Sequence, residues 1–92
     1  MPTIPVLDST MAYRSRGEGP PFVLIHGNPT SSHLWRNILP QIGNLGRALA
    51  PDLIGMGRSG KPPINYGFLD TARYLDAWFD QMELDAVVLV GH

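Results

Sequence analysis

Cysteine is absent from this sequence of 92 residues, and neither sign of charge dominates it. Without a thiol the chain can form no disulfide, no thiolate metal site and no cysteine nucleophile, while the redox compartment stays open. Seven basic and eight acidic side chains leave a formal net charge of -1, which argues against a nucleic-acid-binding surface or a polybasic membrane anchor. No apolar run approaches the ~20 residues of a membrane span, and the first residues do not show a basic segment followed by an apolar block.

What the sequence does contain is typical of a globular protein with a hydrophobic core. Hydrophobic residues make up 43% of the chain and charged residues 16%. Apolar runs over 22–26 and 47–54 suit strands that are buried on both faces of a sheet, the apolar and β-branched run over 86–90 is the strongest strand pattern, and helical patterns over 32–42 and 69–83 separate these runs. The alternation predicts an α/β protein with a mostly parallel sheet flanked by helices.

Weaker patterns surround these elements. We expect residues 1–9 to be an irregular lead-in and residues 10–16 to form an antiparallel edge strand. Pro40 should kink or shorten the end of the first helix. Trp35 should lie in the core, whereas Trp78 falls off the apolar stripe of the second helix, which consists of Leu69, Ala72, Leu75, Phe79 and Met82.

The segment after the first buried strand combines a turn with three possible helix caps. Residues 26–29 read His-Gly-Asn-Pro, and Pro29 cannot prolong a central strand because it has no N–H. Residues 30–32, Thr-Ser-Ser, are all N-cap types. Asn28 is therefore expected at the carboxyl end of a strand, where open α/β sheets bind ligands. From spacing alone, however, a turn residue in the left-handed region is the favoured interpretation of Asn28.

Residues 55–60 read Gly-Met-Gly-Arg-Ser-Gly, which fits a dinucleotide-binding fingerprint placed after a strand. That fingerprint needs a helix to begin directly behind it, so that the helix N-terminus meets the pyrophosphate. Pro62 and Pro63 make an extended segment the expected structure there instead. We therefore interpret residues 55–60 as a glycine-rich turn.

Three other side chains could take part in catalysis, but each has a simpler structural interpretation. His26 and His92 precede their loops rather than standing at the loop tips, so neither is expected to act as a base. Asp52 is expected to organise a loop by accepting hydrogen bonds from backbone N–H groups.

The order of these elements resembles the N-terminal part of the α/β-hydrolase fold over nearly all of the chain. Residues 26–32, 34–37, 52–62 and 73–77 are similar to the haloalkane dehalogenases of that fold. The His-Gly pair is shared by the whole superfamily, whereas Asn28 followed by Pro-Thr-Ser-Ser is specific. Epoxide hydrolases usually carry an aromatic residue at this position, and coelenterazine-type luciferases share much of the loop.

The resemblance implies hydrolysis of haloalkanes to alcohol and halide through a covalent aspartyl–alkyl ester, with no cofactor and no metal. It assigns to Asn28 the amide that donates to the departing halide, which makes Asn28 the candidate catalytic and substrate-binding residue. The nucleophile would follow His92, a Trp halide donor would come next, and the catalytic His would lie far downstream. The expected partners are a small halogenated aliphatic substrate, halide, water and the remainder of the same polypeptide. The expected location is a bacterial-type cytoplasm, with the periplasm left open.

On this interpretation residues 1–92 are the N-terminal part of a single α/β-hydrolase core domain, without the cap domain and the C-terminal half. Alone they are not expected to catalyse the reaction, and substrate preference is undetermined because the cap shapes the pocket. Alternative functions on the same scaffold are a luciferase-like monooxygenase, an epoxide or ester hydrolase, and a non-catalytic ligand receptor. Asp then Trp after His92 would indicate a dehalogenase or luciferase, and Ser an esterase or receptor.

The glycine-rich turn predicts a negative result in a binding experiment. Because no helix is expected directly after residue 60, fluorescence titration of the protein with NADH or FAD should reveal no saturable micromolar binding. Saturable binding that is abolished by Gly57→Val would contradict the interpretation.

Overall fold

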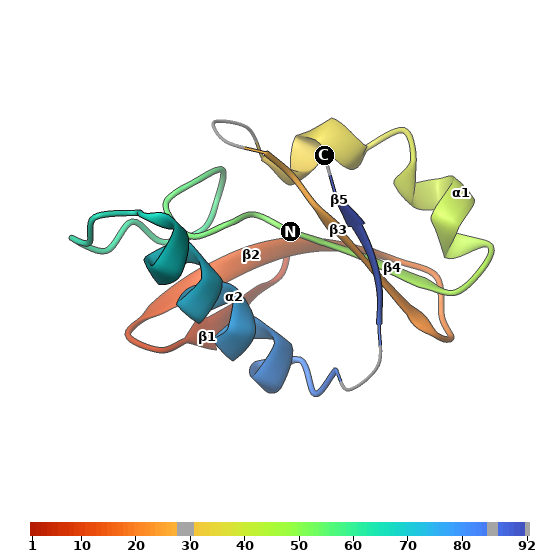
Figure 1. The fold of residues 1–92 in the computed structure, drawn as a ribbon. Coiled ribbons are helices and arrows are strands. Elements are labelled where there is room, and N and C mark those ends of the chain that lie inside the picture. The colour runs from red at the N-terminus through yellow and green to blue at the C-terminus, as the bar shows by residue number, and fades with distance from the viewer. Residues whose placement is uncertain (28–30, 85–86, 92) are drawn as a thin grey trace.

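The computed structural model describes residues 1–27, 31–84 and 87–91 (Figure 1). Its elements are β1 (Thr3–Val6), β2 (Ser9–Arg16), β3 (Pro21–Ile25), the 3₁₀ helix η1 (Ser32–Trp35), α1 (Leu39–Gly43), β4 (Arg47–Pro51), α2 (Phe68–Gln81) and β5 (Val88–Gly91). In this described part five strands form one sheet, in the order β1-β2-β4-β3-β5. Strand β3 is parallel to both β4 and β5, whereas β2 is antiparallel to β1 and β4.

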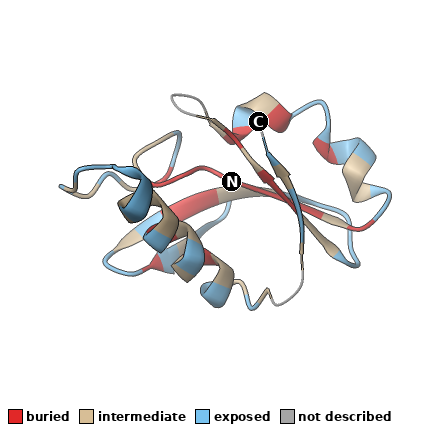
Figure 2. Cartoon of the chain, in the orientation of Figure 1, coloured by how far each residue is buried: buried red, intermediate tan, exposed pale blue. Residues whose placement is uncertain are grey.

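The sheet is covered on both faces, by α2 on one side and by η1 and α1 on the other (Figure 1). Successive strand residues point to opposite faces, so Val23 packs in the cluster with α2 and Leu24 packs in the cluster with η1 and α1. In the same way, Leu49 packs in the cluster with α2, whereas Ala48 and Ala50 pack in the cluster with η1 and α1. Figure 2 shows buried residues along the middle of the sheet. Strands β3 and β4 are thus buried on both faces, which confirms the prediction from their apolar runs.

The first nine residues are not an irregular lead-in, and β2 is not an edge strand. Strand β1 pairs with β2 through a two-residue turn, since Val6 lies opposite Ser9, and β1 is therefore the outer strand. An edge strand tolerates Pro5 because it can dispense with one ladder N–H. The turn includes Leu7 at φ 53°, a conformation that apolar residues rarely adopt. Leu7 therefore gives no turn signal, and Asp8 is the one turn-forming residue in this two-residue turn.

The helix expected over 32–42 is two short helices, η1 and α1, with a turn between them. Pro40 lies in the first turn of α1 rather than at the end of a helix. A proline in the first turn of a helix needs no helical N–H. In one continuous helix, however, its ring would clash with the carbonyl of Arg36, four residues earlier. The expected single helix is therefore interrupted before Pro40. At its other end, α1 closes near Gly43 as expected, and the N–H groups of residues 45 and 46 donate to the carbonyl of Ile42.

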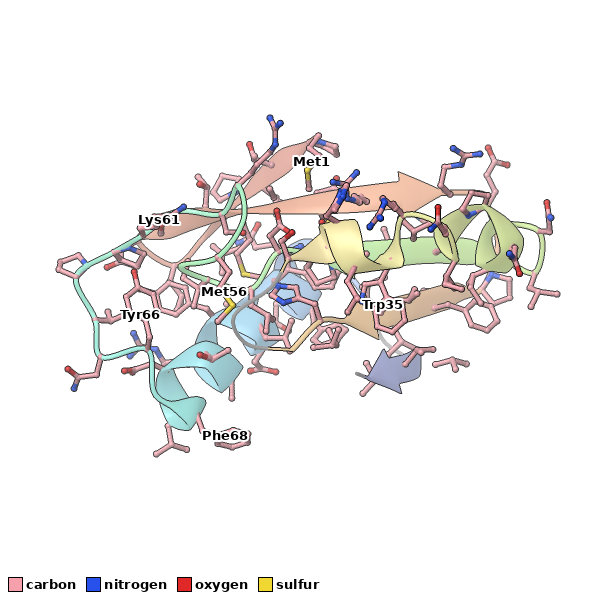
Figure 3. All side chains as sticks on the ribbon, turned by 90° about the horizontal axis from the view of Figure 1, so that it is seen from above. Met1, Trp35, Met56, Lys61, Tyr66 and Phe68 are labelled. Atoms are coloured by element: carbon pink, nitrogen blue, oxygen red, sulfur yellow. The ribbon has the colours of Figure 1, made fainter. Side chains whose placement is uncertain are left out.

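Helix α2 forms where the pattern predicts it, and Leu75, Phe79 and Met82 of the predicted stripe pack against the core, but the most deeply buried side chains of the helix lie beside that stripe. Tyr74 and Trp78 are 0% exposed, whereas Leu69 is 81% exposed. Figure 3 shows Phe68 at the outer end of the helix, away from the sheet. The predicted stripe is wrong in this respect because Tyr74 and Trp78, four residues apart, bring the two largest side chains onto the sheet. Trp78 packs edge-on against Tyr13 of β2, with ring centroids 6.1 Å apart.

The two remaining apolar runs form shorter strands than predicted. Strand β4 ends at Pro51, where the chain turns into a hydrogen-bonded loop. Strand β5 begins at Val88, and residue 86 of the predicted run over 86–90 lies outside the described residues. Val88 and Leu89 are exposed, and β5 is the outer strand on its side of the described sheet.

Residues 55–60 form a turn that contacts β2. The Gly55 N–H donates to the Gly60 carbonyl at 2.9 Å, and the Gly60 N–H donates to the Thr10 carbonyl at 2.8 Å. The next helix begins only at Phe68, so none follows Gly60 directly, as the two prolines predict. Tyr66, labelled in Figure 3, lies against Gly55.

Gly55→Ala should destabilise the protein. Gly55 has φ 81°, and a Cβ there would lie 2.3 Å from Cε1 of Tyr66. Strain of this kind costs about 1–3 kcal/mol, which chemical denaturation would measure. Gly67→Ser is the control, because nothing lies within 4 Å of a Cβ at this position and serine is also an N-cap residue. Equal losses in the two variants would argue against strain at Gly55.

Tyr74→Phe should lower the melting temperature at neutral pH. The Tyr74 hydroxyl donates to Oδ1 of Asp8 at 2.5 Å. This hydrogen bond to the carboxylate, together with burial, raises the pKa of Tyr74 above 10.0, although Arg73 opposes the shift. The folded state holds the phenolic proton of Tyr74 more tightly than the unfolded state does. The stabilisation of the fold by this hydrogen bond is therefore complete below pH ~10, and it declines as the pH rises through the higher pKa of the folded state.

Thermal unfolding of the wild type and of Tyr74→Phe between pH 7 and pH 11 would measure this effect. The difference in melting temperature should narrow above pH ~10. Tyr13→Phe controls for the loss of one phenolic hydroxyl. A difference that stays constant across this range would show that the Asp8 contact is not its source.

Candidate active site

The carboxyl ends of three parallel strands meet at one edge of the sheet. In β3 and β4, Val23 lies opposite Leu49, so the residues that follow the two strands, His26 and Asp52, emerge side by side. On the other side of β3, Ile25 lies opposite Gly91 of β5. The loop predicted to bind the ligand therefore leaves β3 between the ends of its two neighbours.

Asn28, the site residue predicted from the sequence, lies outside the described residues, as does His92. The residues on both sides of Asn28 are described. His26 is buried at the start of the loop, and Ser31 caps η1 at its end. The Ser31 side chain accepts a hydrogen bond from the His33 N–H at 3.3 Å. This confirms one of the three predicted cap residues.

Asp52 accepts hydrogen bonds from the backbone of two different loops. Its Oδ1 accepts the Ser32 N–H at 2.6 Å, and its Oδ2 accepts the Arg58 N–H at 2.9 Å. The side chain is 2% exposed. A carboxylate removed from water needs such donors, because an unsatisfied buried charge is very costly. The predicted loop-organising role of Asp52 is confirmed, and both oxygens are occupied by backbone donors.

His26 is held in a single tautomer by its neighbours. Its Nε2 accepts the Leu53 N–H at 2.9 Å, while its Nδ1 lies 2.7 Å from the Gly27 carbonyl. Since Nε2 is an acceptor, the proton is assigned to Nδ1, which donates to that carbonyl. The acceptor nitrogen is thus occupied by a backbone N–H, which agrees with the expectation that His26 is not a catalytic base.

Two buried serines complete this hydrogen-bonded group, in roles that the sequence pattern alone does not reveal. The Ser59 hydroxyl donates to the Asp52 carbonyl and accepts the Ala12 N–H at 3.0 Å, which connects the glycine-rich turn to β2. The Ser32 hydroxyl accepts a hydrogen bond from Nε of Arg14 at 3.0 Å. Both serines stand in segments already marked as a turn or a cap. Their burial, however, depends on strands that are distant in the sequence.

The hydrogen bonds of this group position backbone segments of the described residues. The oxygens of Asp52 and Nε2 of His26 are engaged by backbone N–H groups. In the part of the chain that is described, no three His, Asp or Glu side chains are close enough to hold a metal ion. No helix in the same residues is long and apolar enough to cross a membrane.

One cavity in the described part of the chain lies elsewhere. Its volume is about 280 Å³, and it is lined by Met1, Pro2, residues 13–16 of β2, Arg36, Leu39 and Pro40. None of the four buried polar side chains described above lines this cavity. We therefore locate the candidate site at the carboxyl edge of the sheet, on the basis of strand register and hydrogen bonding.

Comparison with known proteins gives a consistent result. Residues 20–92 match the family described as alpha/beta hydrolase fold. The chain is 57% identical over 89 residues to a haloalkane dehalogenase of Mesorhizobium japonicum and 53% identical over 89 residues to one of Bradyrhizobium diazoefficiens. These alignments cover 96% and 95% of this chain but only 29% of each relative.

Solved structures agree with the sequence relatives. The haloalkane dehalogenase DbeA from Bradyrhizobium elkani USDA94 superposes with a TM-score of 0.96 at 50% identity, covering 98% of this chain and 32% of that one. For DatA from Agrobacterium tumefaciens C58 the TM-score is 0.93 at 46% identity, covering 98% and 31%. The chain thus spans about a third of the relatives that it matches. It belongs to the α/β-hydrolase fold family, and the relatives named above are haloalkane dehalogenases.

Proposed function

We propose that this chain supplies the first third of a haloalkane dehalogenase, a hydrolase that converts haloalkanes to alcohol and halide. The observation that supports this most directly is the register of β3 and β5. Ile25 lies opposite Gly91, so a chain that continues from β5 would emerge beside the loop that carries Asn28. In this proposal a nucleophile following His92 and the halide donor Asn28 act together at this edge of the sheet.

The proposed reaction has two steps. An Asp carboxylate following His92 attacks the halogen-bearing carbon, so that a C–O bond forms, the carbon–halogen bond breaks and the halide leaves with the bonding electrons. A water molecule, which loses its proton to a downstream His, then attacks the ester carbonyl and releases the alcohol and the free carboxylate. Neither step requires a cofactor or a metal.

The side chain of Asn28 suits the first step for an electrostatic reason. The departing halide gains negative charge in a site that excludes water, and a donor already aimed at it lowers the barrier. A neutral amide supplies this donor without a charge. A Lys or Arg would pair with the carboxylate nucleophile and would hold the product halide too tightly.

The remaining parts of the proposal follow from the same resemblance. The substrate is a small halogenated aliphatic compound, and a cap domain carried by the rest of the polypeptide shapes its pocket. The second halide donor is the Trp after the nucleophile. The protein acts in the cytoplasm of a bacterium, which cell fractionation would test.

Asn28→Ala should slow carbon–halogen cleavage in the whole protein. Removing one preorganised donor typically costs ~100- to 1000-fold in rate, or roughly 3–4 kcal/mol. Hydrolysis of the preformed alkyl ester should slow much less, because the halide has already left. Single-turnover kinetics on a bromoalkane separates the two steps.

Asn65→Ala is the matched control, since Asn65 is an exposed residue far along the chain from the loop. It should leave both steps near the wild-type rate. If Asn28→Ala cleaves at the wild-type rate but melts many degrees lower, Asn28 is a turn residue and not a halide donor. Absence of halide release in the wild type, with light emission on coelenterazine, would favour the luciferase alternative.

A further inference from the structure

The two ends of the loop that carries Asn28 are hydrogen bonded to consecutive residues of another segment. At the start of the loop, His26 accepts the Leu53 N–H at 2.9 Å. At its end, the Ser32 N–H donates to Asp52 at 2.6 Å. Both bonds are buried, and they join residues 27 and 20 positions apart in the sequence. The separation of the loop ends is therefore governed by the geometry of residues 52–53.

Asp52 is itself held in place from several directions. Its backbone N–H donates to the Ala12 carbonyl of β2 at 2.8 Å, and its carbonyl accepts the Ser59 hydroxyl. Its second carboxylate oxygen accepts the Arg58 N–H at 2.9 Å. The residue that receives Ser32 thus cannot move independently of the inner sheet and the glycine-rich turn.

We propose that Asp52 is a positioning residue that holds the Asn28 loop in the geometry required for halide binding. This inference rests on the proposed function, because it assigns Asp52 a role in presenting the halide donor. A donor lowers the barrier only if it is already aimed at the developing charge. The Ser32–Asp52 bond supplies that constraint without any contact between Asp52 and substrate.

An aspartate is suited to this role because it offers two acceptor oxygens to two N–H groups. An asparagine offers one acceptor oxygen and an NH2 group, and the NH2 would face a second N–H donor. Asp52→Asn therefore keeps the size of the side chain but must give up the bond to Ser32 or the bond to Arg58. A small displacement of a catalytic group can cost on the order of 100-fold in rate.

The first experiment compares Asp52→Asn with Asp76→Asn in the whole protein. Asp76 is an exposed residue of α2, so Asp76→Asn makes the same chemical change outside the hydrogen-bonded group and keeps the Ser32–Asp52 bond. Hydrogen exchange at the Ser32 amide should become faster in Asp52→Asn than in Asp76→Asn. The carbon–halogen cleavage rate should fall about 10- to 100-fold in Asp52→Asn, with kcat reduced and KM little changed.

The outcomes separate this inference from the proposed function. Halide release by the wild type, with equal exchange and equal cleavage rates in the two variants, would overturn the positioning role and leave the proposed function intact. A wild type that releases no halide would overturn the proposed function, and with it the halide role of Asp52. Exchange at Ser32 would still show in that case whether Asp52 holds the loop.

A second pair of variants tests the same bond if Asp52→Asn does not fold. Ser32→Pro removes the N–H that Asp52 accepts, at the first position of η1, where proline is tolerated. The preceding Ser31 is already extended, at φ -152° and ψ 179°, as a residue before proline should be. Ser32→Ala is the control, since it keeps the N–H and loses only the hydroxyl that binds Arg14. Cleavage should slow more in Ser32→Pro than in Ser32→Ala, and equal rates would overturn the proposal.

Discussion

The buried carboxylate of Asp52 connects parts of the chain that would otherwise be independent loops. It joins the start of η1 to the glycine-rich turn, while its backbone is fixed to β2. Such a charge is tolerated away from water because backbone N–H groups point at both oxygens. Removing one partner from a group of this kind leaves the others unsatisfied, so the surrounding loops depend on one another.

This arrangement also explains the glycines that resemble a dinucleotide fingerprint. A Cβ on Gly57 would lie 2.4 Å from Oδ2 of Asp52, and Gly57 has φ 53°. Glycine is therefore needed there so that the turn can approach the carboxylate closely. A glycine spacing that can bring backbone N–H groups to a phosphate here brings the turn to the carboxylate of Asp52, which is part of the protein. The same motif can arise in both cases because both require exposed N–H groups at close range.

The strands determine the geometry of the carboxyl edge of the sheet, where the candidate site lies. Because β3 and β4 are buried on both faces, a shift of register would move apolar side chains to the wrong layer. Their register in turn brings His26 and Asp52 together after the strand ends. On the opposite face from η1 and α1, Tyr74 and Trp78 hold α2 against the sheet. The strained hairpin at Leu7 is linked to this helix by the bond between Tyr74 and Asp8.

Local chemistry alone determined the buried strands, the existence of α2, a hydroxyl cap within residues 30–32 and the absence of a helix directly after Gly60. Each follows from apolar periodicity, hydroxyl capping or the missing N–H of proline, which act over a few neighbouring residues. The fold as a whole and the interpretation of Asn28 came from a resemblance to a family, since spacing alone favoured a turn residue. Only the tertiary structure decided that residues 3–6 pair with β2, that α2 buries Tyr74 and Trp78 instead of Leu69, and that His26 and Ser32 bind residues 52–53. These features depend on partners brought together from distant parts of the chain, and a local pattern cannot specify which partner lies opposite.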